Sequence, residues 1–347
     1  MANKVYLAPT WETAQQLKEA LEEQGIRYHT VEAEYGNNVL EGKTTLAHHV
    51  ARFKDNPAPC NTEVHKIPEG DVIIISHIDL DTIGGVLALQ GRKPQDEAFW
   101  RTAEFIDLNG PHHINVEPHV QLKDKFNAYW GWVNTQPREQ RPTDVVDVTA
   151  KIEEHAAILE RVMTNDPELI ANGREWAENV AREVESKLVA ENEFVRVFET
   201  DRVFCNSSYY SPNLEKIVPN IVTYNRHFGS ITVSTANTQD LNAKEMVQRL
   251  FGPEAGGHPG IGGSPRGQEM SKPTVAGYEE DLAMKDRPLD RERIVAVLQG
   301  TVEPKTDFER AVHAVAREME RKYSRNVELE SELHHNVEAD VDIERQR

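Results

Sequence analysis

The sequence predicts an α/β protein with a parallel-sheet N-terminal domain, a helical connector and a smaller α/β domain. The segment Asp71–Ile75 is largely β-branched and apolar on both faces, which is typical of a central strand in a parallel sheet. Before it, a strand, a helix and a second strand alternate between Lys4 and Ala33, as in a β-α-β unit. Strands resume beyond a long helical stretch, and 347 residues suffice for about two domains.

In the N-terminal domain, Thr10 with Thr13 nearby predicts where the first helix begins, and Gly25 predicts where it ends. The helix after the central strand should pack against the sheet, and a further short core strand is expected to end at Asp107. The expected elements are strand Lys4–Leu7, helix Thr10–Glu23, strand Ile26–Ala33, strand Asp71–Ile75, helix Thr82–Gln90 and strand Ala103–Ile106.

The rest of the chain is expected to contain a helical stretch, a second set of strands and a polar end. Apolar residues at helical spacing predict helix over Thr143–Glu193. The further elements are strands Phe194–Phe198, Arg202–Phe204, Ile217–Tyr224 and Ser230–Thr235, helix Ala243–Phe251, a glycine-rich loop Gly256–Gly267 and helix Thr306–Tyr323. The predicted domains are residues 1–150, a connector at 151–193, a second domain at 194–270 and a polar helical extension at 271–347.

Composition narrows the class of partner. The net charge is −19 and no basic patch stands out, which argues against a grip on long nucleic acid and favours small anionic substrates held through metal ions. No apolar run approaches the ~20 residues that span a bilayer, so no membrane partner is expected. The two cysteines, Cys60 and Cys205, and an N-terminus unlike a signal peptide favour a reducing, cytoplasmic location.

The first chemical motif follows the central strand. His77, Asp79 and Asp81 occupy alternate positions where the strand ends and a helix begins, and ligands bind at that edge of open α/β sheets. Imidazole and carboxylate together suit Mn, Zn or Fe. The alternative is that these residues only cap the helix N-terminus, where carboxylates are favoured.

A second motif is Asp107 followed by the histidine pair His112-His113 after an Asn-Gly-Pro turn. Adjacent histidines are commonly surface residues, and the doublets His48-His49 and His334-His335 are interpreted in that way. A third motif is the glycine-rich segment that contains His258 and Arg266, whose backbone N–H groups and side chains could bind phosphate. The alternative for that segment is a flexible linker.

Together these motifs resemble the DHH phosphoesterase superfamily over residues 70–267. The segment His77–Asp81 is similar to its first metal motif, Asp107 to its bridging aspartate and His112-His113 to its namesake pair. Asp147 matches the last metal aspartate best, with Asp144 as the rival. The glycine-rich segment is similar to the signature of the DHHA1 substrate domain. The chain departs from the family at Pro111, which stands at the namesake aspartate position.

The resemblance implies a two-metal hydrolase of phosphoric esters, with Mn as the expected metal and Mg, Co or Fe as alternatives. The implied substrates are small nucleotides, cyclic dinucleotides or short oligonucleotides, and a homodimer is compatible with it. The implied metal ligands are His77, Asp79, Asp81, Asp107, His112 and Asp147. The implied catalytic residues are His112 and His113, and the implied substrate-binding residues are His258, Arg266, Gly256, Gly257, Ser234 and Asn237.

Three other interpretations stay open at this point. A single-strand exonuclease of the RecJ type would need a basic channel with aromatic stacking platforms. A catalytically degenerate scaffold of the same fold is favoured by Pro111. An inorganic pyrophosphatase of similar fold would carry an Arg-Lys cluster near Gly256–Gly267, and the sequence has none there.

Overall fold

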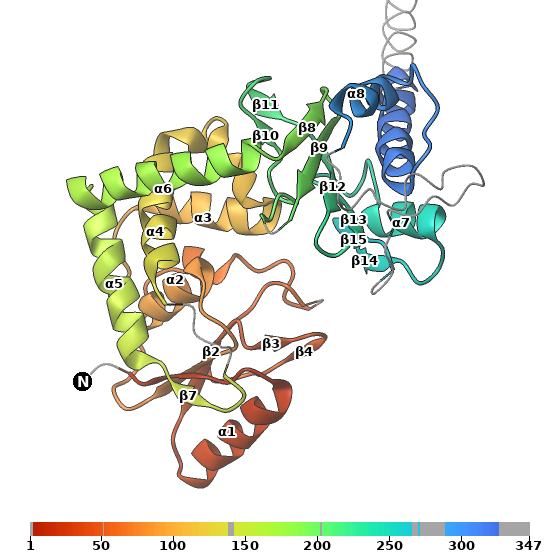
Figure 1. Ribbon diagram of the computed structural model, residues 1–347. Helices are drawn as coiled ribbons and strands as arrows, with labels where there is room; N and C mark the ends of the chain where they lie inside the picture. Colours follow the sequence, from red (N-terminus) through yellow and green to blue (C-terminus); the bar gives the residue numbers. More distant parts are fainter. Residues whose placement is uncertain are drawn as a thin grey trace, which may run out of the picture. The chain divides into compact units, whose positions relative to one another are not determined.

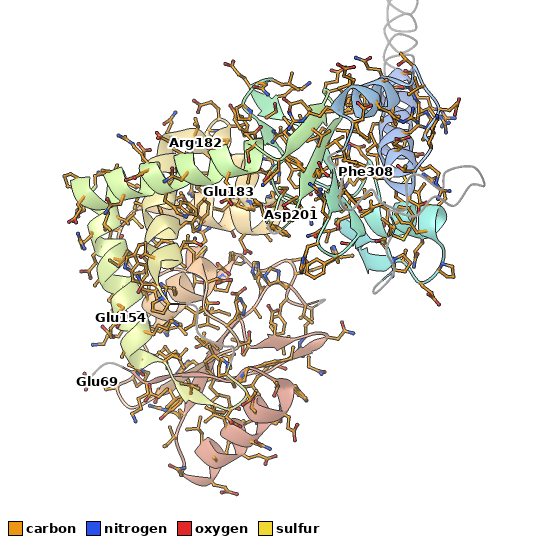
Figure 2. All side chains as sticks on the ribbon, viewed as in Figure 1. Glu69, Glu154, Arg182, Glu183, Asp201 and Phe308 are labelled. Atoms are coloured by element: carbon orange, nitrogen blue, oxygen red, sulfur yellow. The ribbon has the colours of Figure 1, made fainter. Side chains whose placement is uncertain are left out.

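The computed structural model describes residues 3–50, 52–137, 142–201, 203–265, 270 and 289–325. The chain divides into two compact units, Met1–Asn179 and Val180–Arg347 (Figure 1). Charged side chains such as Glu69 and Glu154 are exposed (Figure 2). Among the described residues, no helix combines the length and the apolar character needed to cross a membrane.

The first unit is built on a five-stranded sheet in the order β5-β2-β6-β1-β7. All neighbours are parallel except β7, which pairs antiparallel with β1. The strands are β1 (Val5–Leu7), β2 (Tyr28–Val31), β5 (Thr45–Leu46), β6 (Val72–Ile75) and β7 (Val146–Asp147). Every residue of β6 is buried, which confirms the predicted central strand.

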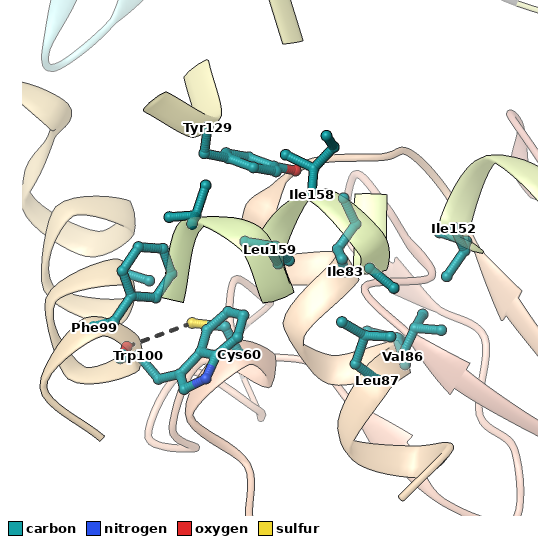
Figure 3. Close-up of a cluster of buried hydrophobic side chains, with 14 of the residues drawn as sticks. Cys60, Ile83, Val86, Leu87, Phe99, Trp100, Tyr129, Ile152, Ile158 and Leu159 are labelled. Atoms are coloured by element: carbon teal, nitrogen blue, oxygen red, sulfur yellow. Dashed lines mark hydrogen bonds between the residues drawn. The ribbon is translucent and has the colours of Figure 1, made fainter. Parts of the chain in front are cut away.

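Helices cover both faces of this sheet. The alternation of side chains along β6 sends Ile73 and Ile75 to one face and Val72 and Ile74 to the other. The first face packs against the larger core, part of which Figure 3 shows, and the second packs against α1. The helices are α1 (Trp11–Glu23), α2 (Leu80–Leu89), α3 (Glu97–Asn109), α4 (Lys123–Thr135) and α5 (Thr149–Met163).

The predicted start of α1 is confirmed by its cap. The Thr10 hydroxyl accepts a hydrogen bond from the Thr13 backbone, and the Thr13 hydroxyl accepts one from the Thr10 backbone, which is a capping box. The helix ends before Gly25, whose φ of 69° is unfavourable for residues with a Cβ.

The strand predicted over Ala103–Ile106 is wrong, because these residues lie inside α3. Phe99, Trp100, Ala103 and Ile106 are all buried, and their spacing forms one helical stripe that a four-residue window does not reveal. Asp96 caps the start of α3 by accepting a hydrogen bond from the Phe99 N–H.

The long helical stretch is divided between the two units. Helix α5 contributes Ile152, Leu159 and Val162 to the core of the first unit (Figure 3 shows Ile152 and Leu159). Helix α6 (Pro167–Glu185) crosses the boundary between the units, and strand β8 (Leu188–Glu191) lies within the range predicted as helix. The strand predicted over 202–204 is also absent, since Val203 and Phe204 are irregular and Arg202 lies outside the described residues.

The second unit has a six-stranded sheet in the order β14-β15-β13-β12-β9-β8, in which only β9 and β12 are parallel. Its further strands are β9 (Val195–Thr200), β12 (Asn220–Asn225), β13 (Ser230–Thr235), β14 (Gly256–His258) and β15 (Ile261–Gly263). One face packs against α7 (Ala243–Phe251), α8 (Arg291–Gln299) and a helix over 307–325. The predictions for β13 and α7 are confirmed to the residue.

Two parts of the second unit differ from expectation. The predicted glycine-rich loop contains the β14-β15 hairpin, and a Cβ on Gly262 would lie 2.6 Å from the Ala243 carbonyl oxygen of α7. Glycine at this position therefore lets the hairpin lie directly on the helix. The predicted polar extension contributes Leu289, Val297 and Phe308 to the core of the unit.

Short two-stranded pairs and 3-10 helices complete the described chain. The pairs are β3 (Glu34–Tyr35) with β4 (Asn38–Val39), and β10 (Tyr210–Ser211) with β11 (Lys216–Ile217). The 3-10 helices are η1 (Pro59–Asn61), η2 (Pro111–Asn115) and η3 (His119–Leu122).

Candidate metal centre

Polar residues follow three neighbouring parallel strands of the first unit. Glu32 comes directly after β2, His48 and His49 follow β5, and His77 to Asp81 follow β6. Because β5, β2 and β6 are adjacent and parallel, their carboxyl ends meet at one edge of the sheet. Helix α3 adds Asp107 from its last turn.

The buried centre of this cluster is formed by Glu32 and His48. The Nε2 atom of His48 lies 3.2 Å from Glu32 Oε1, 3.3 Å from Asp81 Oδ2 and 3.4 Å from Asp107 Oδ2. The side chains of His48 and Glu32 are 0% and 1% exposed. The Nε2 atom of His48, which is out of contact with bulk water, thus faces three carboxylates.

The rim of the cluster is more open. His49 Nε2 lies 3.3 Å from Glu32 Oε1, and His77 Nε2 lies 3.3 Å from Glu32 Oε2 and 2.9 Å from Asp79 Oδ2. The side chains of His49, His77 and Asp79 are 50%, 44% and 44% exposed. The cluster is therefore exposed to solvent on this side.

Neighbouring groups hold these side chains in place. Thr82 Oγ1 donates a hydrogen bond of 2.7 Å to Glu32 Oε2, so both carboxylate oxygens of Glu32 are engaged. The Ser76 hydroxyl donates to the Glu32 carbonyl oxygen and lies 2.8 Å from His77 Nδ1. Its lone pair therefore accepts from Nδ1–H, which leaves His77 Nε2 facing the cluster, as a metal-binding imidazole requires.

From the sequence, Asp79 was interpreted either as a helix cap or as a metal ligand. Its Oδ1 atom accepts a hydrogen bond of 2.8 Å from the Thr82 N–H and caps α2, while Oδ2 faces His77. The capping interpretation and the ligand interpretation are therefore compatible at this residue, because each uses a different carboxylate oxygen.

The electrostatics show how strongly this cluster holds positive charge. Burial would lower the pKa of His48, but hydrogen bonds and charge from Asp81 and Glu32 raise it to about 10. Hydrogen bonds to Asp79 and Glu32 raise the pKa of His77 to about 10 as well. A metal ion that binds here must displace these protons, so metal and protons compete for the same atoms.

The surroundings shift the pKa values of two carboxyl groups, Asp107 and Glu32, in opposite directions. Burial, with the negative charges of Asp81 and Glu32, raises the pKa of Asp107 to about 6. Burial also acts to raise the pKa of Glu32, yet hydrogen bonds from His48, His49 and His77 outweigh it and hold that pKa far below its usual range. Glu32 is therefore the permanent anion at the centre of the cluster.

The donor set could hold a metal ion. Its ligand atoms form three overlapping groups, within each of which all atoms lie within 4.8 Å of one another. Imidazole nitrogens combined with carboxylate oxygens suit Mn, Zn or Fe. The groups are Glu32 with His48 and His49, Glu32 with His77 and Asp79, and His48 with Asp81 and Asp107.

Of the ligands expected from the sequence, His77, Asp79, Asp81 and Asp107 come together, whereas Asp147 does not. The Asp147 Oδ1 atom accepts hydrogen bonds from the Thr149 N–H at 3.0 Å and the Thr149 hydroxyl at 2.6 Å. Its other oxygen lies 3.8 Å from Lys4 Nζ. The rival Asp144 accepts from the Thr143 hydroxyl and, within the described residues, also stands outside the groups.

The pair His112-His113 also lies outside the three groups in the part of the chain that the structure describes. Burial and the neighbouring His113 lower the pKa of His112 to about 4, so its ring is neutral at physiological pH. His113 packs edge-on against Phe105, with the ring centroids 5.2 Å apart.

The substrate-binding residues expected in the second unit differ in their exposure and in the hydrogen bonds that they already make. Ser234 is buried and donates to the Asn206 carbonyl oxygen at 2.8 Å, and Asn237 donates to Asp240. His258 is exposed, and its Nδ1 accepts from the Gly260 N–H at 3.2 Å. Arg266 lies outside the described residues.

Gly256 and Gly257 belong to β14 and line a hollow of about 850 Å³. A Cβ on Gly256 would meet no atom within 4 Å, so the backbone there is open. The hollow is lined by Phe228, Ser230, Ile231, Thr232, Glu254, Gly256, Gly257, Ile261, Gly262, Gly263, Ser264 and Pro265.

Sequence reasoning missed Glu32, His48 and His49. The interpretation of His48-His49 as a surface doublet is wrong for His48, which is buried at the centre of the cluster, while His334-His335 lies outside the described residues. Their place in the sequence could have indicated them, because Glu32 and His48 follow the ends of short strands just as His77 does. The two-residue strand β5 is too short for the sequence pattern to reveal it.

Comparisons with known proteins add no family. No protein-family model matches the chain, and no curated protein matches it. Among solved structures, an uncharacterized protein from Helicobacter pylori G27 aligns over 74% of each chain with 11% sequence identity and a TM-score of 0.19. A similarity at that level carries no argument about fold or function, so the geometry of the candidate metal centre is the basis for assigning a function.

Proposed function

We propose that the protein is a metal-dependent phosphoesterase of the DHH type that hydrolyses small nucleotides, cyclic dinucleotides or short oligonucleotides. The observation that supports this most is the convergence of seven side chains that could bind metal, with Glu32 and His48 at the centre of the other five. Four of the seven are residues that the family resemblance implies as metal ligands, namely His77, Asp79, Asp81 and Asp107.

The arrangement supports two ions that lie next to each other, because Glu32 and His48, each a candidate ligand of a different ion, are in contact. One ion would be held by Glu32, His77 and Asp79, and the other by His48, Asp81 and Asp107. His49 would complete the coordination from the rim. Divalent ions held there, with Mn first and Mg, Co or Fe as alternatives, would supply positive charge beside a phosphate and activate water for attack on phosphorus.

The buried side chains at the centre of the cluster and the exposed side chains at its rim would have different functions. Glu32 and His48 are buried away from the entry side, so they serve to keep the ligand set together. The half-exposed His49 and His77 lie where a phosphate group would enter, and the ring nitrogen of His49 that does not face Glu32 can donate to its oxygens. Ser76 maintains the orientation of His77 throughout.

The charge balance favours a small substrate. Four carboxylates of the cluster would repel a phosphate in the absence of cations, so binding should depend on the metal. With a net charge of −19, the chain has little to offer a long polyanion. Within the second unit, the exposed His258 and the open backbone at Gly256 remain candidates for binding phosphate.

A hydrolysis panel with Mn²⁺ tests the proposal. It should run from bis-p-nitrophenyl phosphate through dinucleotides to long single strands, with metal content measured on the same preparation. We expect about two transition-metal ions per chain, turnover of the small substrates, loss of turnover on chelation and recovery on addition of Mn²⁺. A protein that binds no divalent metal would instead support a scaffold, and preferred turnover of long strands would support the exonuclease.

A further inference from the structure

The short helix η1 (Pro59–Asn61) contacts a candidate metal ligand through its backbone. The Cys60 N–H donates a buried hydrogen bond of 2.8 Å to Asp81 Oδ1. Asp81 is 3% exposed, and its other oxygen, Oδ2, faces His48. The amide of Cys60 therefore sets which oxygen of Asp81 points into the cluster.

The thiol of Cys60 also lies beside Asp81 and interacts with its carboxylate through hydrogen bonding and charge. Burial and the nearby charge of Asp81 raise the pKa of the thiol far above its usual range, so it stays protonated. Its Sγ lies 3.8 Å from the Trp100 carbonyl oxygen, on the side of the hydrophobic core (Figure 3). Both groups of Cys60 that interact with Asp81, the amide and the thiol, are carried by η1, so the position of η1 determines how Asp81 is held.

Helix α2 presents two glycines where η1 lies on it. A Cβ on Gly84 would come within 2.6 Å of Cys60 Cβ, and one on Gly85 within 2.8 Å of Pro59 Cβ. Both are closer than real Cβ contacts, so any larger residue would push η1 away. The glycine pair that follows Asp81 in sequence thus brings η1 close enough for its amide to reach Asp81.

Glu104 of α3 fastens the other side of η1. Its Oε1 accepts a hydrogen bond of 2.9 Å from the Ala58 N–H, and its Oε2 accepts one of 2.7 Å from Asn61 Nδ2. Glu104 stands three residues before Asp107, on the same face of α3. The same helix face therefore carries one candidate ligand directly and holds the segment that orients another.

We propose that Glu104 is a positioning residue of the metal centre, acting on Asp81 through η1 without touching the metal. The inference rests on the proposed metal binding and deepens it. Loss of the two acceptors should free η1, weaken the bond from Cys60 to Asp81 and reduce metal affinity. Outer-shell partners of this kind typically contribute about 10–100-fold to affinity.

The test compares Glu104→Leu with Glu104→Gln. Leucine fills a similar volume and accepts no hydrogen bond. Glutamine removes the charge but can still accept from the Ala58 N–H, and a turn of the Asn61 amide restores the second bond. Val162→Ala, a truncation in the buried core of α5, controls for a general loss of stability in the same unit.

Two readouts separate this inference from the proposed function. In metal-free protein, exchange of the Cys60 amide proton should be about 10-fold faster in Glu104→Leu and near wild type in the other two variants. In the second readout, Mn²⁺ affinity measured by calorimetry should fall about 10–100-fold in Glu104→Leu alone. Wild-type affinity in Glu104→Leu, or equal losses in Glu104→Leu and Val162→Ala, would overturn the positioning role. Failure of the wild type to bind Mn²⁺ would overturn the proposed function, and this inference with it.

Discussion

Glu32 shows how one buried residue can organise a site. It lies at the end of β2 with a φ of 46°, which is uncommon for a residue with a side chain, and it is 1% exposed. Its carboxylate faces the imidazoles of His48, His49 and His77. A strained, buried anion persists only where the surroundings hold it, and such residues cluster at functional sites.

Glu32→Gln should therefore remove metal binding with little change in shape. The amide keeps the volume of the side chain but loses the negative charge that would bind one candidate ion and that lies beside His48, a candidate ligand of the other. We expect Mn²⁺ affinity to fall at least about 100-fold, which exceeds the range typical of outer-shell changes. Metal content after dialysis against Mn²⁺ provides the measurement, and Glu23→Gln, an exposed residue at the end of α1 in the same unit, provides the control.

Variants at Asp81 and Asp147 test whether the family resemblance or the structure assigns the metal ligands correctly. The family resemblance implies both as ligands, whereas the structure brings only Asp81 into the cluster. We expect Asp81→Asn to lower Mn²⁺-dependent hydrolysis at least about 100-fold and Asp147→Asn to leave it within about twofold. Initial rates at saturating Mn²⁺ decide the matter, and equal losses in the two variants would restore Asp147 to the ligand set.

Among the elements, α4 and α5 share a buried polar contact. Tyr129 of α4 lies with its hydroxyl 2.9 Å from His155 Nδ1 of α5, and both side chains are buried. Burial, with the nearby Lys151, lowers the pKa of His155 to about 4. The folded protein therefore holds this imidazole neutral at pH values where an unfolded chain would protonate it.

The pH dependence of stability follows from that difference. The stability that His155 contributes is fully present above pH 6.5, its usual pKa, and is lost as the pH falls towards about 4. Over this window the loss amounts to about 3 kcal/mol at most. Urea unfolding at pH 7 and pH 4.5 should show a smaller acid-induced loss for His155→Gln than for wild type, and parallel curves would contradict the assignment.

At the level of the whole molecule, the two units can be followed separately. All five tryptophans, Trp11, Trp100, Trp130, Trp132 and Trp176, lie in the unit Met1–Asn179 that holds the candidate metal centre. The second unit, Val180–Arg347, has its own core and a buried cation, Arg196, that donates to Glu185 and Glu191. Tryptophan fluorescence therefore reports on the first unit alone.

Mn²⁺ should stabilise the first unit selectively. Binding to the folded state at a free concentration of 100 times Kd adds about 2.7 kcal/mol to the free energy of unfolding. We expect the fluorescence-detected melting temperature to rise with Mn²⁺, while Arg196→Met should lower the stability of the second unit without changing that response. A rise of equal size in the Glu32→Gln variant would show that the stabilising ion binds elsewhere.

Features whose pattern is local could be predicted from the sequence. The strand β6 is a continuous β-branched run, Thr10 and Thr13 form a capping box, and β13 and α7 have clear periodicity, so each is written within a few neighbouring residues. The motif at His77, Asp79 and Asp81 was visible for the same reason, since strand, ligands and helix are contiguous. In contrast, the four residues Ala103–Ile106 were too few to distinguish a strand from the helix α3.

The residues that complete the site could be identified only once the order of the strands was known. Glu32, His48 and Asp107 are separated by 16 and 59 positions. They meet because β2, β5 and β6 are neighbours in one sheet and because α3, which packs against α2 and η1, brings Asp107 to the same edge. Strand order depends on long-range pairing, which no local pattern encodes. The same reason excluded Asp147, because the antiparallel pairing of β7 with β1 places it beside Thr149 and Lys4 instead of in the cluster.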